Sequence, residues 1–212
     1  MSKRFFHVLP FVSLLACADP SGDSASGDIP SADSAGAAAL TAADVAGRWA
    51  SPACEAYDDG KGGHNYLTRD FQLTGSAWHL DLGVFGDEGC SYPLFSATID
   101  GTFTLDGPSS VVSGGTDGEF RFDSIVWTAQ DAGVAKWFTA SGCGAEPWEV
   151  GVPQDVGTTG CVGVAHPIAE CPQEYDVVGL VGGDLYFGER VTDMCTASGR
   201  PAAFSPYGLA AR

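Results

Sequence analysis

The sequence has few basic residues and no motif for binding a metal or a nucleotide. It carries 27 acidic residues against 10 basic ones, a formal net charge of −17. This balance offers no electrostatic surface for nucleic acid or anionic lipid headgroups. None of the seven cysteines lies in a C-x-x-C pair, which argues against a zinc site. Walker and dinucleotide-binding loops are missing as well, so no cofactor is expected.

Catalytic constellations are also missing from the sequence. No serine lies in Gly-x-Ser-x-Gly, and His64, His79 and His166 fall in turns or on polar strand faces. The adjacent carboxylates of Asp58 and Asp59 are typical of a solvated turn rather than of an acid–base pair, and they lack the alternating oxygen ligands of a calcium loop. We therefore expect no enzymatic activity and no bound metal.

The N-terminus carries a signal for export. A short basic start precedes an apolar run over residues 5–16, which is too short to span a bilayer. The run ends Leu14-Leu15-Ala16-Cys17, which resembles a bacterial lipobox, whose cysteine becomes the lipid-modified first mature residue. We predict a lipoprotein signal peptide over residues 1–16 and lipidation of Cys17. An ordinary signal peptide with an incidental Cys17 is the alternative. In Ala18-Asp19, the residue directly after Cys17 is alanine, whereas an acidic residue at this second position commonly retains lipoproteins at the inner membrane. The sequence therefore favours the outer membrane of a bacterial cell envelope.

The segment after the anchor cysteine predicts a tether. Residues 18–44 contain five aspartates and no basic or aromatic residue. Such a segment cannot bury enough apolar surface to offset its ordering entropy. The sequence therefore predicts a lipidated cysteine and disordered acidic linker over residues 17–44, followed by a folded domain over residues 45–212.

Alternating apolar and polar residues predict strands through the folded domain. Residues 66–73, 78–84, 94–106 and 119–129 follow this pattern. Gly101 indicates a bulge or bend. A second bulge resets the register near Ser124, or both faces of that strand are covered. Residues 130–141 predict a short helix, and residues 162–165 a short strand. We expect an all-β, antiparallel, barrel-like domain, half-open and reminiscent of lipocalins, with one short helix.

Six cysteines remain after Cys17, and an even number in an exported chain indicates disulfides. A hairpin around Gly182-Gly183 brings Cys171 nearly opposite Cys195, so we predict that these two pair. The stretch over residues 143–161 has no apolar period and predicts a long ordered loop, either a purely structural staple or a functional segment.

The folded part resembles the adenomatosis polyposis coli down-regulated family. The motifs that carry the resemblance run in order along the chain: Gly47-x-Trp49-x-Ser51-x-x-Cys54-Glu55, Tyr66-Leu67-Thr68-Arg69-x-Phe71, Cys90-x-x-Pro93, Gly114-Gly115-Thr116, Cys143-Gly144-Ala145-Glu146 with Trp148, Gly160-Cys161 and Leu185-Tyr186-Phe187. The resemblance implies disulfides Cys54–Cys90 and Cys143–Cys161, which leaves Cys171 for Cys195. It also implies a half-open barrel whose apolar cavity accepts a lipid or acyl chain. Animal members resemble inhibitors of Wnt signalling that bind acylated Wnt ligands.

Large apolar residues on the predicted strand faces, in the helix and in the loop are the candidate cavity lining. They are Phe71, Trp78, Leu82, Ile99, Phe103, Phe122, Trp127, Trp137, Trp148 and Phe187. Arg69 is a candidate partner for a ligand carboxylate, or a solvent-facing strand residue. We expect a lipid or acylated ligand and a membrane anchor as partners. The alternative is that these side chains fill the barrel and that the protein is a cell-surface interaction module without a small ligand.

Overall fold

The computed structural model describes residues 38–58, 63–162 and 164–212, so the predicted signal peptide and Cys17 lie outside the described residues. The described part forms ten strands and one α-helix. They are β1 (Gly47–Ala50), β2 (Glu55–Asp58), β3 (His64–Thr74), β4 (Ala77–Phe85), β5 (Pro93–Pro108), β6 (Thr116–Ala129), α1 (Ala132–Ala140), β7 (Pro153–Asp155), β8 (Gln173–Val181), β9 (Asp184–Phe187) and β10 (Ala210–Ala211). A short 3-10 helix covers Ala197–Gly199.

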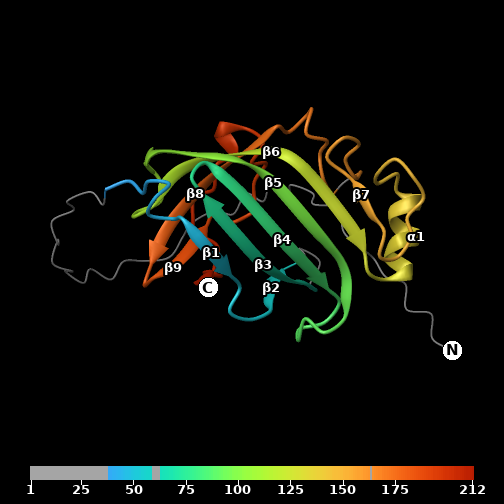
Figure 1. Cartoon of the computed structure of the whole chain (residues 1–212). Coiled ribbons are helices and arrows are strands. Elements are labelled where there is room, and N and C mark those ends of the chain that lie inside the picture. Colours follow the sequence, from blue (N-terminus) through green and yellow to red (C-terminus); the bar gives the residue numbers. More distant parts are fainter. Residues whose placement is uncertain (1–37, 59–62, 163) are drawn as a thin grey trace, which may run out of the picture.

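All strand pairs are antiparallel and belong to one sheet. Its order is β10-β1-β3-β4-β5-β6-β8-β9, with β2 paired to β3 and β7 paired to β6. The sheet curls round (Figure 1) until Leu185 of β9 and Leu209 exchange backbone hydrogen bonds of 2.9 and 2.8 Å. Because Leu209 directly precedes β10, this contact joins the two ends of the strand order. The result is a nearly closed barrel, and it confirms the predicted all-β fold.

The strands that line the barrel follow the predicted alternation of buried and exposed side chains. In β4, Trp78 and Leu80 are buried, whereas Asp81 is exposed. β1 stops at Ala50, and the chain leaves the sheet after Ser51, whose N–H still donates to the Arg69 carbonyl oxygen at 2.8 Å, because Pro52 cannot extend a paired strand. The barrel wall is therefore interrupted between the end of β1 and the start of β2.

A β-bulge in β6 keeps its large apolar residues on the inner face. Gly101 of β5 pairs with Phe122, and the next pair along the ladder uses Ser124, so Asp123 is an extra residue. This confirms the predicted register reset near Ser124. Gly101 fits here because a Cβ atom at this position would lie 1.8 Å from the carbonyl oxygen of Arg121. A larger residue would push the two strands apart.

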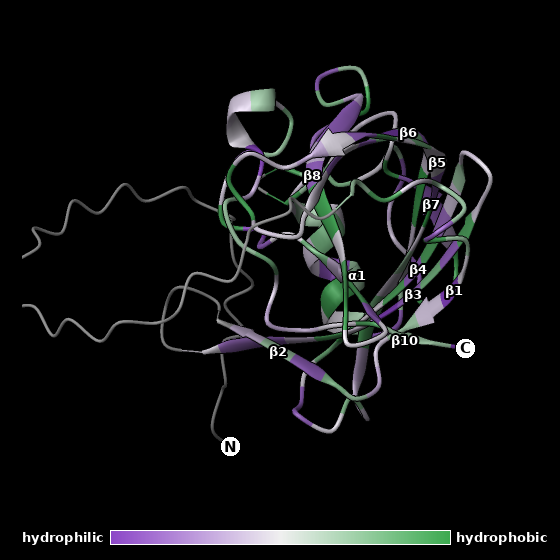
Figure 2. Ribbon diagram, turned by 90° about the vertical axis from the view of Figure 1, so that its left-hand side faces the viewer, coloured by the Kyte–Doolittle hydropathy of each residue, from purple (hydrophilic) through white to green (hydrophobic). Residues whose placement is uncertain are grey.

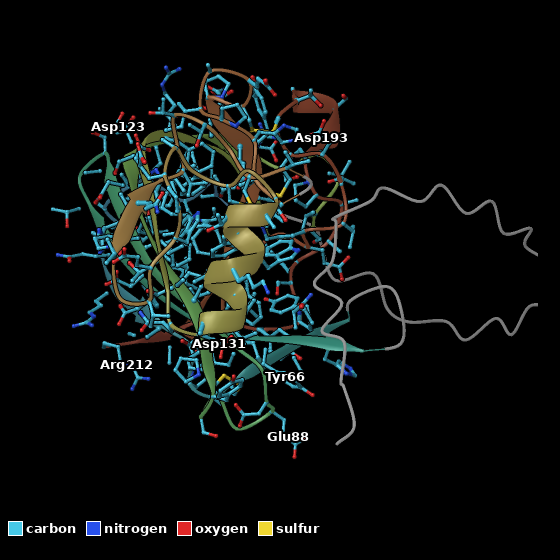
Figure 3. The ribbon with its side chains drawn as sticks, turned by 90° about the vertical axis from the view of Figure 1, so that its right-hand side faces the viewer. Tyr66, Glu88, Asp123, Asp131, Asp193 and Arg212 are labelled. Carbon is cyan, nitrogen blue, oxygen red and sulfur yellow. A yellow bond between two sulfur atoms is a disulfide. The ribbon has the colours of Figure 1, made fainter. Side chains whose placement is uncertain are left out.

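Helix α1 lies across one end of the barrel. Figure 2 looks along the barrel with α1 at its far end, and Figure 3 shows α1 in front, with Asp131 at its start. The side chain of Asp131 accepts hydrogen bonds from the backbone N–H groups of Gly133 (2.7 Å) and Val134 (3.0 Å). This is an N-cap, which satisfies two of the helix's free donors. The helix predicted over residues 130–141 is thus confirmed.

Three disulfides tie the strands and loops together. The pairs are Cys54–Cys90, Cys143–Cys161 and Cys171–Cys195, the pairs expected from the sequence. The hairpin of β8 and β9 turns at residues 182 and 183, where Val181 pairs with Asp184, as predicted. The first disulfide holds the start of β2 against the turn that follows β4.

Three segments differ from the expectations. The folded part begins before residue 45: Leu40 and Ala42 pack on the barrel core, and the Leu40 N–H donates to the Thr116 hydroxyl at 2.8 Å. The loop over residues 143–161 is not wholly irregular, because β7 within it pairs with β6. The strand predicted over residues 162–165 is wrong: among the described residues of this segment, Cys161 and Ala165 form only an isolated bridge.

Candidate functional site

The inner face of the sheet carries two clusters of buried apolar side chains. The barrel cluster contains Val45, Trp49, Phe71, Leu73, Trp78, Leu80, Phe103, Phe120, Val178, Leu185, Phe187 and Leu209. The end cluster lies beneath α1 and contains Ala97, Ile125, Trp127, Ala129, Val134, Ala135, Phe138, Cys143, Trp148, Val156 and Cys161.

Aromatic rings fill much of the barrel cluster. Phe71 stacks on Phe187 with ring centroids 4.5 Å apart, and Trp78 meets Phe120 edge-on at 5.7 Å. The indole N–H of Trp78 donates to the carbonyl oxygen of Arg121 at 3.0 Å, beside the bulge. Because its polar atom has a partner, Trp78 is buried without leaving an unsatisfied donor. This part of the barrel is a packed core.

Three half-buried residues connect the two clusters. Leu82, Ile99 and Phe122 pack against both clusters, and they come from the neighbouring strands β4, β5 and β6. We call them the shared strip. Each remains partly exposed to solvent, unlike the cluster residues on either side. The shared strip is therefore apolar surface on the inner face, where an apolar ligand could bury further area.

The loop over residues 143–161 is fastened to the end of the barrel. Trp148 is buried against Phe138, with ring centroids 4.7 Å apart, and its indole N–H donates to the Cys143 carbonyl oxygen at 2.6 Å. The backbone N–H of Val156 donates to the carbonyl oxygen of Ile125 in β6 at 2.9 Å. These contacts make the loop a brace for α1 and the end cluster.

A buried ion pair lies on the inner face where β2 meets β3. Arg69 Nε lies 3.0 Å from Glu55 Oε2, and the Glu55 side chain is 2% exposed. The hydroxyls of Ser51 (2.6 Å) and Tyr57 (3.0 Å) also donate to Glu55. Burial raises the pKa of Tyr57 to about 12, so its hydroxyl stays protonated and donates. Glu55 thus has a partner for each oxygen, as a buried charge requires.

The predicted lining residues divide between these features. The barrel cluster buries four of them, Phe71, Trp78, Phe103 and Phe187. The end cluster buries Trp127 and Trp148, and the half-buried Trp137 packs against it. The shared strip consists of the other three apolar residues, Leu82, Ile99 and Phe122. Arg69 faces Glu55, which gives its guanidinium a carboxylate within the protein.

Sequence reasoning missed the polar residues around Arg69. Glu55 follows Cys54 in a short segment without clear alternation, and its position on the inner face depends on its pairing with Leu67 of β3. The Tyr207 carbonyl oxygen, which accepts from Arg69 at 3.0 Å, is 138 positions away in sequence. The sequence did carry one signal for a structural role of Glu55: it follows Pro52-Ala53-Cys54, where the chain begins a new strand.

Two pockets lie on the outer side of the sheet, away from the shared strip. One, of about 410 Å³, lies beside the end of β1, and the other, of about 560 Å³, lies between the β6 bulge and residues 155–169. Among the described residues, no group of three or more His, Cys, Asp or Glu side chains is placed to hold a metal ion. No helix in that part of the chain is long and apolar enough to cross a bilayer.

The family comparison agrees with this architecture. A family model described as Adenomatosis polyposis coli down-regulated 1 matches residues 28–152, which is more than half of the chain. The matched region includes β1 to β6 and α1, and with them the shared strip and the Glu55–Arg69 pair. The chain therefore belongs to the adenomatosis polyposis coli down-regulated 1 family.

Proposed function

We propose that this protein is a membrane-anchored extracytoplasmic lipoprotein whose barrel-like domain binds an acyl chain or a similar apolar ligand at the shared strip. The observation that carries the proposal is the partial exposure of Leu82, Ile99 and Phe122 between two buried clusters. Apolar concavities with few polar groups are the usual sites for small ligands. An acyl chain along three neighbouring strands would complete the burial of these side chains.

The Glu55–Arg69 ion pair beside the shared strip leaves no free charge for a ligand headgroup. Arg69 and Leu82 pair across β3 and β4, so they share the inner face. Arg69 is satisfied by Glu55 and by the carbonyl oxygen of Tyr207. Its charge is therefore compensated, and the ligand needs no carboxylate to bind beside it. We assign the ligand by its chain rather than by its headgroup.

The anchor in this proposal rests on the lipobox-like sequence before Cys17. Two or more acyl chains on the N-terminus would hold the protein stably at a membrane, whereas one chain gives marginal binding. A Cys17→Ser variant should leave the membrane fraction. If it stays there, the anchor is refuted, while the ligand proposal can still be tested.

Lipid extraction gives the direct test of the ligand. The purified protein is denatured and extracted, and the extract is analysed by mass spectrometry against a mock purification. We expect a fatty acid or phospholipid in stoichiometric amount, besides any lipid covalently attached at Cys17. A barrel that yields no lipid and binds no fluorescent fatty-acid analogue would refute the proposal.

Paired variants locate the site on the shared strip. Leu82→Gln should weaken binding of the fluorescent analogue about tenfold, because a leucine contact contributes roughly 1.5 kcal/mol. Leu105→Gln is the matched control: Leu105 is also a half-buried leucine of the sheet, but it packs on the barrel cluster alone. Equal losses in the two variants would indicate general destabilisation rather than a binding site.

A second candidate function has its own observation. The stacked rings of Phe71, Phe187, Trp78 and Phe120 fill the barrel cluster. Side chains fill small barrels in this way without leaving room for a ligand. A cell-surface interaction module with a packed barrel is therefore the alternative, and it predicts empty lipid extracts and unchanged partner binding in Leu82→Gln.

A further inference from the structure

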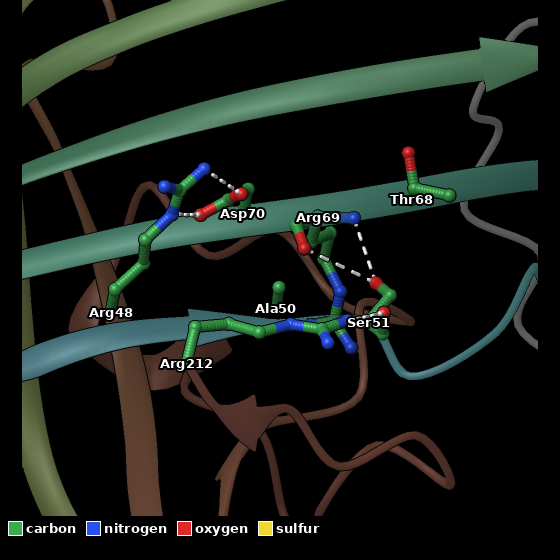
Figure 4. A pocket seen from close by; sticks show the side chains of 7 residues that line it. All are labelled: Arg48, Ala50, Ser51, Thr68, Arg69, Asp70 and Arg212. Carbon is green, nitrogen blue, oxygen red and sulfur yellow. Dashed lines mark hydrogen bonds and ion pairs between the residues drawn. The ribbon is translucent and has the colours of Figure 1, made fainter.

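The interruption of the barrel wall after β1 forms a notch on the outer face. β1 ends at Ala50 and β2 joins β3 no further than Leu67. Ser51 still bonds to Arg69, through its N–H to the Arg69 carbonyl oxygen at 2.8 Å and through its hydroxyl, which accepts from the Arg69 N–H at 2.7 Å, so the gap lies opposite Thr68. The outer pocket of about 410 Å³ lies here. Figure 4 shows the Arg212 side chain extending toward Ser51, with Arg48 turned to Asp70.

The notch gathers positive charge in a strongly acidic chain. Arg48, Arg69 and Arg212 line it, three of the 10 basic residues in a protein of net charge −17. Asp70 binds Arg48 at 2.6 Å, with Asp81 beside it on β4, and Glu55 binds Arg69 at 3.0 Å. Among the described residues, no carboxylate lies within ion-pair distance of the Arg212 guanidinium, so this group is the one of the three without a salt bridge.

Donors remain for a ligand at this point. Arg212 donates from Nη2 to the Ser51 carbonyl oxygen at 3.2 Å, and within the described residues its Nε and Nη1 have no acceptor. Arg48 uses Nε and Nη2 on Asp70 and keeps Nη1. The Arg48 side chain is 61% exposed, and an ion pair so exposed contributes little stability. Arg48 can thus exchange part of its contact with Asp70 for an incoming anion at small cost.

We propose that this notch binds a phosphate-class oxyanion carried by a free small molecule. Guanidinium forks match the oxygen geometry of phosphate, and more than one fork can bind its several oxygens. A volume of about 410 Å³ is in the range of small-molecule sites and exceeds that of a lone phosphate. A bilayer phosphate is the other source of this chemistry. Outside the notch, a chain of net charge −17 offers no basic surface that would hold the domain against anionic headgroups, so we assign the free molecule.

This site is independent of the proposed acyl-binding function. The notch opens on the outer side of β1 and β3, where Arg48 and Asp70 lie, and the shared strip lies on the inner face. Arg69 also lines the notch from the inner face, but Glu55 and the Tyr207 carbonyl oxygen hold its guanidinium. Phosphate titration without lipid therefore tests the notch alone, and the fatty-acid assay tests the strip alone.

The test is calorimetric titration of the purified protein with inorganic phosphate at fixed ionic strength, with sodium chloride as the reference salt. Arg212→Gln should raise the Kd for phosphate about tenfold, because it removes a charge-assisted donor. Asp70→Asn should lower the Kd, because it removes a carboxylate that competes with the ligand. The opposite signs separate a site from a general loss of folding.

Arg121→Gln is the matched control. Arg121 is an exposed arginine of β6 with one side-chain contact, to Gln173 Oε1 at 3.2 Å, and it does not line the notch. Its phosphate affinity should equal that of the wild type. Absence of saturable phosphate binding, or equal loss in Arg121→Gln and Arg212→Gln, overturns the proposal.

Vesicle sedimentation separates the two sources of phosphate. A protein with the proposed lipid on Cys17 would insert into any bilayer, so the quantity compared is the difference in sedimentation between phosphatidylglycerol and phosphatidylcholine vesicles. We expect no preference for phosphatidylglycerol. A preference that disappears in Arg212→Gln would overturn the assignment to a free molecule and assign the notch to a lipid headgroup.

Discussion

The barrel cluster and the end cluster are built from differently arranged segments. The barrel cluster draws on residues from Val45 to Leu209 and depends on closure of the sheet by its most distant strands. The end cluster combines the ends of β5 and β6 with a nearly continuous segment, residues 134–161. Its order comes from an N-cap, a disulfide and the short strand β7. The difference implies that the end can loosen while the barrel stays folded, whereas loss of the barrel unfolds the whole domain.

Trp78→Ala should have the largest effect, because it opens the barrel cluster at its centre. Replacing a buried tryptophan by alanine costs roughly 3–5 kcal/mol of unfolding free energy. The Arg121 carbonyl oxygen also loses its donor. Urea unfolding followed by tryptophan fluorescence and by circular dichroism should give one shifted transition for both signals. The control is His79→Ala, on the outer side of the same strand, which should change stability little. Two separated transitions in Trp78→Ala would contradict the idea that the barrel is one cooperative unit.

Removal of the Cys143–Cys161 disulfide tests the other half of the comparison. The bond spans 18 positions, and a loop of about this size contributes roughly 3 kcal/mol in the chain-entropy model. In Cys143→Ala/Cys161→Ala we expect amide hydrogen exchange to accelerate in α1 and residues 143–161, with β3 and β4 unchanged. The matched control is Cys171→Ala/Cys195→Ala, whose bond spans 24 positions beside β8. It should leave protection of α1 intact. Uniform acceleration in the first variant would show that the end is not a separate unit.

A buried carboxylate makes the barrel side sensitive to pH. Asp176 of β8 is 3% exposed and accepts backbone N–H groups from Val177 (2.7 Å) and Gly188 (2.9 Å). Burial raises its pKa from 3.8 to about 6. Because the folded pKa is raised, the stabilisation is complete below pH 3.8 and is lost as the pH rises through about 6.

Asp176→Asn keeps an acceptor for both N–H groups and removes the charge. Its stability relative to the wild type should therefore increase between pH 4 and pH 7, by roughly 2–3 kcal/mol for a shift of about two units. Urea unfolding at the two pH values measures this difference. A constant difference between the two proteins would contradict the raised pKa.

The sequence predicts those features of the fold that depend on neighbouring residues. Alternation identified the long strands, and Gly182-Gly183 identified the hairpin. The switch of apolar phase after Phe122 left two explanations, a bulge or a strand covered on both faces, and the structure has the bulge. The missed features depend on distant pairing. β7 has three residues and pairs with β6, and closure at Leu209 requires a segment that carries no strand pattern. Local periodicity cannot reveal such contacts, because their stability comes from the partner strand.

The candidate site divides in the same way. Apolar residues of the shared strip could be named from alternation, since inner-face position follows from strand period. The partial exposure of these residues could not be predicted from the sequence, because it depends on where the barrel cluster and the end cluster end in the folded protein. The partner of Arg69 was also hidden: Glu55 is 14 positions away and reaches the inner face through the pairing of β2 with β3.

The smallest expected effect concerns the N-cap of α1, which tests whether the cap or the packing of the end cluster holds this helix. Asp131→Ala removes the N-cap from Gly133 and Val134, and also the acceptor of the Tyr92 hydroxyl. Loss of such a cap costs about 1 kcal/mol. Asp131→Asn retains a cap oxygen and should cost less. Hydrogen exchange should accelerate at the first turn of α1 in the alanine variant and not in β4. Equal behaviour of the two variants would show that the helix is held by packing of Val134 and Phe138 on the end cluster rather than by its cap.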